Sequence, residues 1–190
     1  MTGVQTCALP ICVADVTIVN IFGENHNEMK ELLQMAVHAF LKMKLVKEKK
    51  TCKIVHQNVA AADAEDKLIT DRHNLKQDLD KMAKLAAKHE NCEEEIQKLD
   101  DIIAFEENED VFYIPSLLKG SPPMAPINPN YGRGLQNVKE SIIQLMCSKE
   151  DVKLTVSLFR ERVESLWEAI LKENFIFNFN FHLSSDFTRR

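Results

Sequence analysis

The stretch Thr51-Cys-Lys-Ile-Val-His-Gln-Asn-Val-Ala60 joins an apolar core directly to a run of polar residues. Its β-branched centre is typical of a strand, and His56, Gln57 and Asn58 follow it without a break. In an open α/β sheet, ligands bind at the carboxyl ends of the strands. We therefore interpret His56, Gln57 and Asn58 as a candidate binding site. The alternative interpretation is an ordinary strand end whose polar residues face water.

The residues before this stretch predict a strand and a helix. Asp15–Phe22 is short, β-branched and almost continuously apolar, as a strand buried on both faces would be, and Gly23 ends it. Apolar residues then recur at steps of three and four between Met29 and Phe40, which is one face of a helix. Strand, helix and strand in succession form a βαβ unit, which is normally parallel and right-handed.

The residues after the stretch continue the alternation. Glu65–Lys88 is strongly amphipathic and helical, Asn91 ends it, and Glu93–Ile103 is expected to form a second helix. Adjacent glutamates in that second helix would point to different sides, which favours a solvated face over a metal site. Glu106–Asp110 is expected to be an acidic loop, and Val111–Ile114 a third strand, stopped by a proline.

The last third of the chain is predicted to be a loop followed by helices. Ser116–Asn130 is rich in proline, which predicts an ordered, extended loop. Helical periodicity returns over Leu135–Met146 and Val156–Lys172, and Phe175–Phe181 alternates in a strand-like way. The fold class predicted is α/β, with an incomplete parallel sheet and its helices followed by a helical segment.

Composition excludes several classes of protein. The chain has 190 residues, enough for one domain, or for one domain with part of a second. A net charge of -5 disfavours a general binder of nucleic acid or of anionic membranes. No apolar run reaches transmembrane length. The five cysteines are scattered and form no CxxC pair, which indicates reduced thiols rather than a zinc site or a disulfide framework.

Both ends of the sequence are expected to differ from the rest. Met1–Ile11 is too short and too polar for a signal peptide, and it resembles the conceptual translation of a sequencing-library adapter. We therefore expect residues 1–12 to be non-native and the natural chain to extend upstream. The tail His182–Arg190 is expected to be doubtful as well.

Several catalytic signatures do not occur in the sequence. It contains no GxxxxGK[ST] loop, no GxGxxG and no GxSxG, and no two histidines have metal-ligand spacing. The sequence thus nominates no catalytic residue and no metal ligand.

Four stretches resemble the G domain of the interferon-induced very large GTPases and of their relative, the up-regulator of cell proliferation. The resemblance covers roughly residues 13–179 in order and spacing, and Glu173-Asn-Phe-Ile-Phe177 fits it too. The four stretches are Asp15-Val-Thr-Ile-Val-Asn-Ile-Phe-Gly-Glu-Asn25, Val55-His-Gln-Asn-Val59, Tyr113-Ile-Pro-Ser-Leu117 and Pro122-Pro-Met-Ala-Pro-Ile-Asn128.

The resemblance implies a GTP-binding fold of the P-loop class. In such folds the phosphate loop and the magnesium site come from the first half of the sheet, a half that we expect to be absent from this chain. The base-recognition loop follows a later strand, the place occupied here by Gln57 and Asn58 with His56 beside them, although the usual Asn-Lys-x-Asp pattern is missing. The second base-contacting loop would contain Pro115 and Ser116.

Two functions follow as hypotheses. The first is a partial GTP-binding domain over residues 13–150, with residues 151–181 leading to the next domain. GTP is then the ligand of the intact parent, self-association occurs through the G domain, and the location is cytoplasmic or nuclear. The alternative is a nucleotide-free helical module in which Glu65–Lys172 binds a protein partner.

Overall fold

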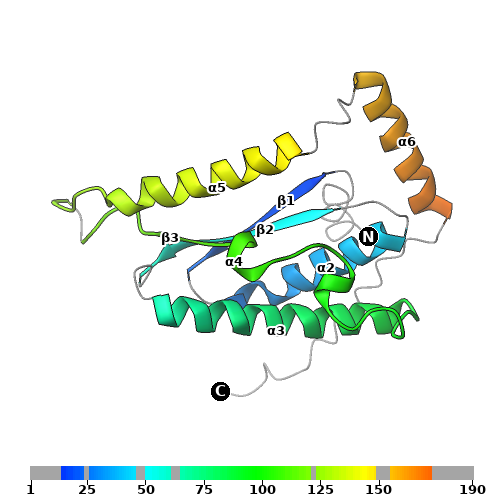
Figure 1. Ribbon diagram of the computed structural model, residues 1–190, viewed down its shortest axis with the longest axis horizontal. Coiled ribbons are helices and arrows are strands. Elements are labelled where there is room, and N and C mark those ends of the chain that lie inside the picture. Colours follow the sequence, from blue (N-terminus) through cyan, green and yellow to red (C-terminus); the bar gives the residue numbers. More distant parts are fainter. Residues whose placement is uncertain are drawn as a thin grey trace, which may run out of the picture.

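The computed structural model describes residues 14–23, 26–45, 50–60, 65–120, 123–148 and 155–172. Strands and helices alternate along the first part of the chain, and two long helices are the last elements among the described residues (Figure 1). The elements are β1 (Val16–Phe22), η1 (His26–Met29), α2 (Lys30–Leu45), β2 (Thr51–Val59), α3 (Glu65–His89), η2 (Leu99–Asp101), α4 (Glu107–Asp110), β3 (Val111–Pro115), α5 (Pro129–Ser148) and α6 (Val156–Lys172).

The three strands form one parallel sheet in the order β1-β2-β3. The predicted α/β class and the predicted parallel pairing of the three apolar runs are therefore confirmed. Ile18 lies opposite Lys53 and Ile54 lies opposite Val111, so the three strands run in step from their amino ends. The register between β2 and β3 shifts after His56, close to their carboxyl ends. This local irregularity falls where the sequence predicted a site.

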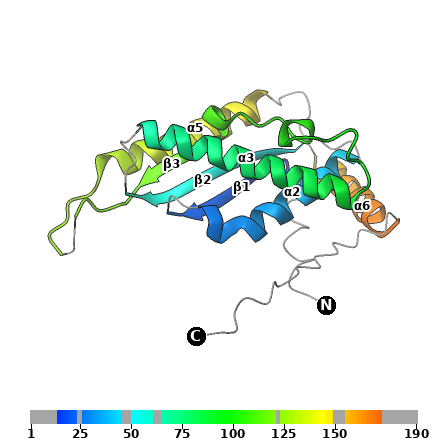
Figure 2. The same cartoon turned by 90° about the horizontal axis from the view of Figure 1, so that it is seen from below.

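Helices cover both faces of the sheet (Figure 2). Helices α2 and α3 lie on one side and α5 lies on the other. Alternate residues of each strand point to opposite faces, so Cys52 and Ile54 face α2 and α3 while Val55 faces α5. The sheet is thus the middle layer of a three-layer arrangement.

The face covered by α2 and α3 carries the main core. Its largest fully buried side chains include Ile21 from β1, Phe40 from α2 and Leu75 from α3. The stretch after α3 closes the cluster from the side with Ile96 and Leu99. Because the helical stripes predicted from the sequence point into this layer, apolar burial here is the main source of stability.

The face covered by α5 is smaller. Val55, Ile114 and Val138 form its buried cluster. Gly134 of α5 lies against Ile114 of β3, since a Cβ placed there would lie 3.4 Å from a side-chain carbon of Ile114, in ordinary van der Waals contact. Helix α5 does not extend over β1, where Ile18 is 50% exposed.

One predicted helix is wrong. Glu93–Ile103 contains turns and the short helix η2 rather than a continuous helix. The carboxylate of Asp101 accepts hydrogen bonds from the backbone amides of Gln97 and Lys98, at 2.8 and 2.9 Å, and Asp80 accepts one from Leu99. Side-chain acceptors therefore take the amides that a helix would have used.

The acidic stretch before β3 also differs from the prediction. The predicted loop Glu106–Asp110 contains the single helical turn α4, which the Asp110 carboxylate stabilises by accepting a 2.9 Å hydrogen bond from the Glu106 amide. Asn91 ends α3 with a positive φ of 55°, as predicted. The predictions for residues 1–12, Phe175–Phe181 and the tail lie outside the described residues.

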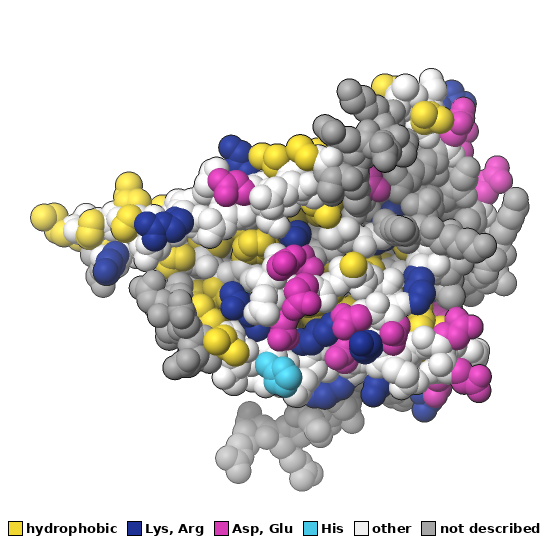
Figure 3. Space-filling model, in the orientation of Figure 1, with side chains coloured by type: hydrophobic (Ala, Val, Ile, Leu, Met, Phe, Trp, Pro, Cys, Tyr) yellow, Lys and Arg dark blue, Asp and Glu magenta, His cyan; other side chains and the backbone are white. Residues whose placement is uncertain are grey.

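The segment between β3 and α5 projects beyond the sheet. Apolar side chains gather on it (Figure 3), where Met124 is 89% exposed and Ile127 73%. A bridge between Leu118 and Ile127 holds its described parts together, as the predicted ordered loop requires. Within the described ranges, no helix has both the length and the apolar character needed to span a membrane.

Candidate functional site

The carboxyl ends of the three strands meet at one edge of the sheet. Gly23, directly after β1, donates its backbone N–H to the carbonyl of Gln57 on β2 at 2.6 Å. Gly23 adopts φ of +82°, a conformation that a residue without a Cβ reaches without steric cost. The end of β1 is therefore fixed to the end of β2 at the level of the candidate site.

Two predicted site residues from different strands come together at this edge. The hydroxyl of Ser116 donates a hydrogen bond to Oδ1 of Asn58 at 2.6 Å, across 58 positions of sequence. Asn58 is exposed and has φ of +59°, a left-handed conformation that asparagine tolerates better than most residues. This hydrogen bond uses the carbonyl oxygen of the Asn58 amide, and the amide N–H groups and the Ser116 hydroxyl are the donor and acceptor types that this edge can offer to a ligand.

His56 occupies a different layer. Its side chain is only 1% exposed and faces α3, because it alternates with Gln57 along β2. Its Nδ1 lies 3.0 Å from the carbonyl oxygen of Gly23. The ring stacks on Tyr113, with centroids 4.8 Å apart and planes 18° apart. His56 therefore lies behind the exposed edge formed by Asn58 and Ser116.

The remaining two predicted residues flank the edge. Gln57 is half-buried, and its backbone carbonyl accepts the Gly23 hydrogen bond. Pro115 is buried at the end of β3, opposite Val59. The structure thus brings Gln57, Asn58, Pro115 and Ser116 to one edge, where Asn58 is exposed, Gln57 and Ser116 are half-buried and Pro115 is buried.

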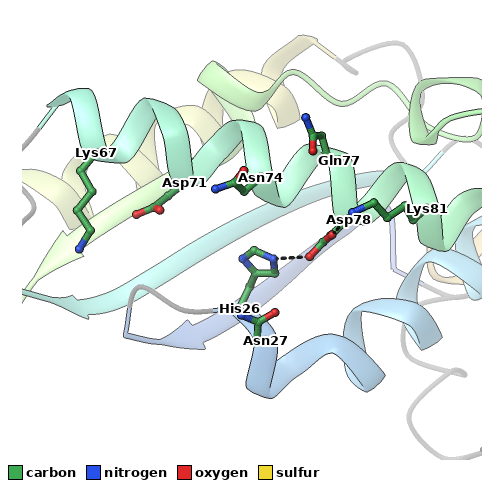
Figure 4. Close-up of a pocket in the computed structure, with 8 residues that line it drawn as sticks. All are labelled: His26, Asn27, Lys67, Asp71, Asn74, Gln77, Asp78 and Lys81. Carbon is green, nitrogen blue, oxygen red and sulfur yellow. Dashed lines mark hydrogen bonds and ion pairs between the residues drawn. The ribbon is translucent and has the colours of Figure 1, made fainter.

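The structure also contains a polar cleft that the sequence did not predict. It encloses about 470 Å³ between η1 and α3 (Figure 4). Two lysines, two aspartates, a histidine and three amides line it: His26, Asn27, Lys67, Asp71, Asn74, Gln77, Asp78 and Lys81. The sequence holds a pattern from which part of this cleft could have been predicted. Five of the lining residues on α3 recur at steps of four and three and so share one helical face: Lys67, Asp71, Asn74, Asp78 and Lys81. The contribution of η1 had no such signal.

Asp78 is the centre of charge in this cleft. Its carboxylate lies 3.0 Å from Nε2 of His26, 3.3 Å from Lys30 and 2.9 Å from Lys81. Hydrogen bonds from Lys81 and then from His26 hold the pKa of Asp78 well below its usual range. The contact with His26 fixes η1 against α3.

Hydrogen-bonding recognition is the chemistry that both places offer. Among the described residues, no group of three or more His, Cys, Asp or Glu side chains could hold a metal ion. The thiol of Cys52 is buried, and burial raises its pKa to about 12, which makes it a poor nucleophile. Amide, hydroxyl and charged groups remain, and these bind and orient polar ligands.

A parallel sheet with helices on both faces defines the chain as an α/β domain, a class in which ligands bind at the carboxyl ends of the strands. The family comparison is more specific. The chain belongs to the URGCP-like GTPase domain family, whose model matches residues 4–132.

Similar proteins agree with this assignment. The chain is 42% identical over 172 residues to interferon-induced very large GTPase 1 of Homo sapiens and 40% identical over 176 residues to that of Mus musculus. It is 24% identical over 159 residues to the up-regulator of cell proliferation of Bos taurus. These alignments cover 89%, 92% and 83% of the chain, but only 7%, 7% and 16% of the relatives. No solved structure matches the chain.

Proposed function

We propose that this chain is the base-recognising part of a GTP-binding domain. Asn58 and Ser116 contact the guanine edge, and Gln57 and Pro115 shape the pocket around it. The observation that carries the proposal is the 2.6 Å hydrogen bond between Ser116 and Asn58, which joins the carboxyl end of β2 to the residue that follows β3. A ligand bound at the carboxyl edge of an α/β sheet meets both loops at once.

The phosphate-binding part belongs to the rest of the parent protein in this proposal. The part of the sheet face over β1 that α5 leaves uncovered supports this proposal. Ile18 and Phe22 are 50% and 76% exposed there, although both faces of a parallel sheet are normally covered. The missing half of the G domain packs there and supplies the phosphate loop and the magnesium site. The parent is interferon-inducible and works in the cytosol or nucleus, and it self-associates through this domain.

The test uses the complete protein that contains this chain, with fluorescent GTP and ATP as probes. Asn58→Gly removes the amide and keeps the positive φ accessible, and Ser116→Ala removes the hydroxyl. Each lost hydrogen bond should weaken GTP binding roughly threefold to tenfold and leave ATP binding unchanged. Gln77→Ala, an exposed amide in the polar cleft, is the matched control.

Two results would contradict the proposal. If Gln77→Ala weakens GTP binding while the edge variants do not, the nucleotide base binds in the cleft between η1 and α3. If the complete protein binds no guanine nucleotide, the alternative of a nucleotide-free interaction module is correct. Light scattering with and without GTP measures the proposed self-association in the same samples.

A further inference from the structure

We infer that His56 is a positioning residue for base recognition: it orients Asn58 through Gly23 and does not contact the ligand itself. The inference rests on the proposed function of the Asn58–Ser116 edge. It assigns to His56 a role different from that of its exposed neighbours.

The first step concerns the proton on the imidazole. A carbonyl oxygen only accepts hydrogen bonds, so the 3.0 Å contact between Nδ1 of His56 and the Gly23 oxygen requires Nδ1 to carry hydrogen. Gly23 in turn donates its own N–H to the carbonyl of Gln57. Residues 56 and 57 therefore hold both polar groups of the Gly23 backbone, one from a side chain and one from the main chain.

The second step concerns the orientation of the ring. His56 and Tyr113 are partners in the β2–β3 register, and their rings stack 4.8 Å apart. The guanidinium of Arg72 on α3 lies 5.3 Å from the centre of the Tyr113 ring. With 1% exposure, the imidazole has almost no room to rotate. β3 and α3 thus fix the direction in which Nδ1 points.

The third step links this arrangement to the exposed edge. Asn58 follows the Gln57 carbonyl that Gly23 holds, and it adopts φ of +59° at the point where the register between β2 and β3 shifts. A left-handed residue outside glycine persists where the surrounding structure determines it. The His56–Gly23–Gln57 contacts supply that constraint, and they set the position from which Asn58 reaches Ser116.

Two variants separate the donor from the ring. His56→Phe keeps a buried aromatic ring against Tyr113 and removes the donor. His56→Asn keeps an N–H donor near the position of Nδ1 and removes the ring. If positioning works through the hydrogen bond to Gly23, the asparagine variant retains function better than the phenylalanine variant. A residue that only fills space would give the opposite order.

The first readout is amide hydrogen exchange in the 190-residue chain itself. In His56→Phe, the Gly23 amide should exchange roughly tenfold faster while the Val19 amide in mid-strand stays protected, because only the strand end loosens. His56→Asn should restore most of the Gly23 protection. Unchanged exchange at Gly23 in the phenylalanine variant overturns the inference, and so does equal loss at Gly23 and Val19.

The second readout is nucleotide selectivity in the complete protein. His56→Phe should reduce the preference for GTP over ATP roughly threefold to tenfold, the scale of one hydrogen bond, without changing ATP binding. If Asn58→Gly reduces selectivity and His56→Phe does not, the positioning role fails while the proposed function stands. If neither variant changes selectivity, the proposed function fails first.

Discussion

The two faces of the sheet differ in how completely they are covered. The face under α2 and α3 has a continuous apolar core drawn from all three strands and both helices. The face under α5 has a small cluster around Val55, Ile114 and Val138, and it is open over β1. The contrast shows that the described residues bury one face of the sheet in a continuous core and leave part of the other face exposed.

Thiol labelling should show the largest difference between the faces. Cys52 points into the α2/α3 core, and burial raises its pKa to about 12, so very little of it is thiolate at neutral pH. Cys147 on α5 is exposed. Iodoacetamide labelling with peptide-resolved mass spectrometry should therefore modify Cys147 long before Cys52, and both should react in denaturing urea. Equal rates in the native protein would contradict a closed core on that face.

The α5 face should depend strongly on one buried ion pair. Lys53 and Asp110 are 6% and 7% exposed, and their charged groups lie 2.5 Å apart. Lys53→Met leaves a buried carboxylate without its partner and should lower the free energy of unfolding by about 3–5 kcal/mol in urea titrations. Lys81→Met, at an exposed pair, should cost less than about 1 kcal/mol.

A second variant decides whether the loss comes from the unpaired charge. Combining Lys53→Met with Asp110→Asn removes both charges, so most of the lost stability should return. If the double variant is as unstable as the single one, packing of the lysine stem rather than its charge stabilises this face.

The apolar core should give the next largest effect. Leu75 on α3 is 1% exposed and Leu135 on α5 is 40% exposed. Leu75→Ala should cost about 2–5 kcal/mol because it leaves a cavity, whereas Leu135→Ala should cost less than about 1 kcal/mol. The measurement is the urea concentration at the midpoint of unfolding, compared between variants whose unfolding free energy depends equally on urea concentration. Similar losses for both leucines would mean that α5 is as deeply packed as α3.

Phe22 should give the smallest change in stability, and its neighbour Ile21 in β1 should give a large one. Ile21 is 0% exposed and Phe22, which points to the opposite face, is 76% exposed. Phe22→Ser should change the unfolding free energy by no more than about 0.5 kcal/mol, while Ile21→Ala should cost about 2–5 kcal/mol. A large loss for Phe22→Ser in the isolated chain would mean that the α5 side of β1 is already covered.

Much of the fold could be predicted because its signals are local. The strands are short β-branched runs, and the helices carry apolar stripes at steps of three and four, so the type and order of these elements can be read from the sequence. Because helices separate the strands, parallel pairing follows as well. Glu93–Ile103 could not be predicted in this way. Asp80, which caps Leu99, comes from a helix 19 positions earlier, and such a contact has no pattern in a sequence window.

The candidate site was predictable in part for the same reason. Gln57 and Asn58 lie at the carboxyl end of β2 and Ser116 follows β3, and the parallel order of the strands brings them to one edge. Successive side chains of a strand point to opposite faces, so the sequence alone could have predicted that His56 points away from Gln57, toward α3. The cleft depends on contacts between η1 and α3, since His26 and Asp78 are 52 positions apart, so its lining required the three-dimensional structure.

Calorimetric titration of the isolated chain with GTP and magnesium tests the central claim most directly. The claim is that this chain recognises the base and that another part of the parent binds the phosphates. Two neutral hydrogen bonds contribute about 1–3 kcal/mol together, less than the roughly 4 kcal/mol of millimolar binding, and association also loses rigid-body freedom. The account therefore predicts no binding tighter than about 1 mM and no GTP turnover. Micromolar binding, or hydrolysis above the buffer rate, would show that the chain contains a phosphate site of its own and would contradict the account.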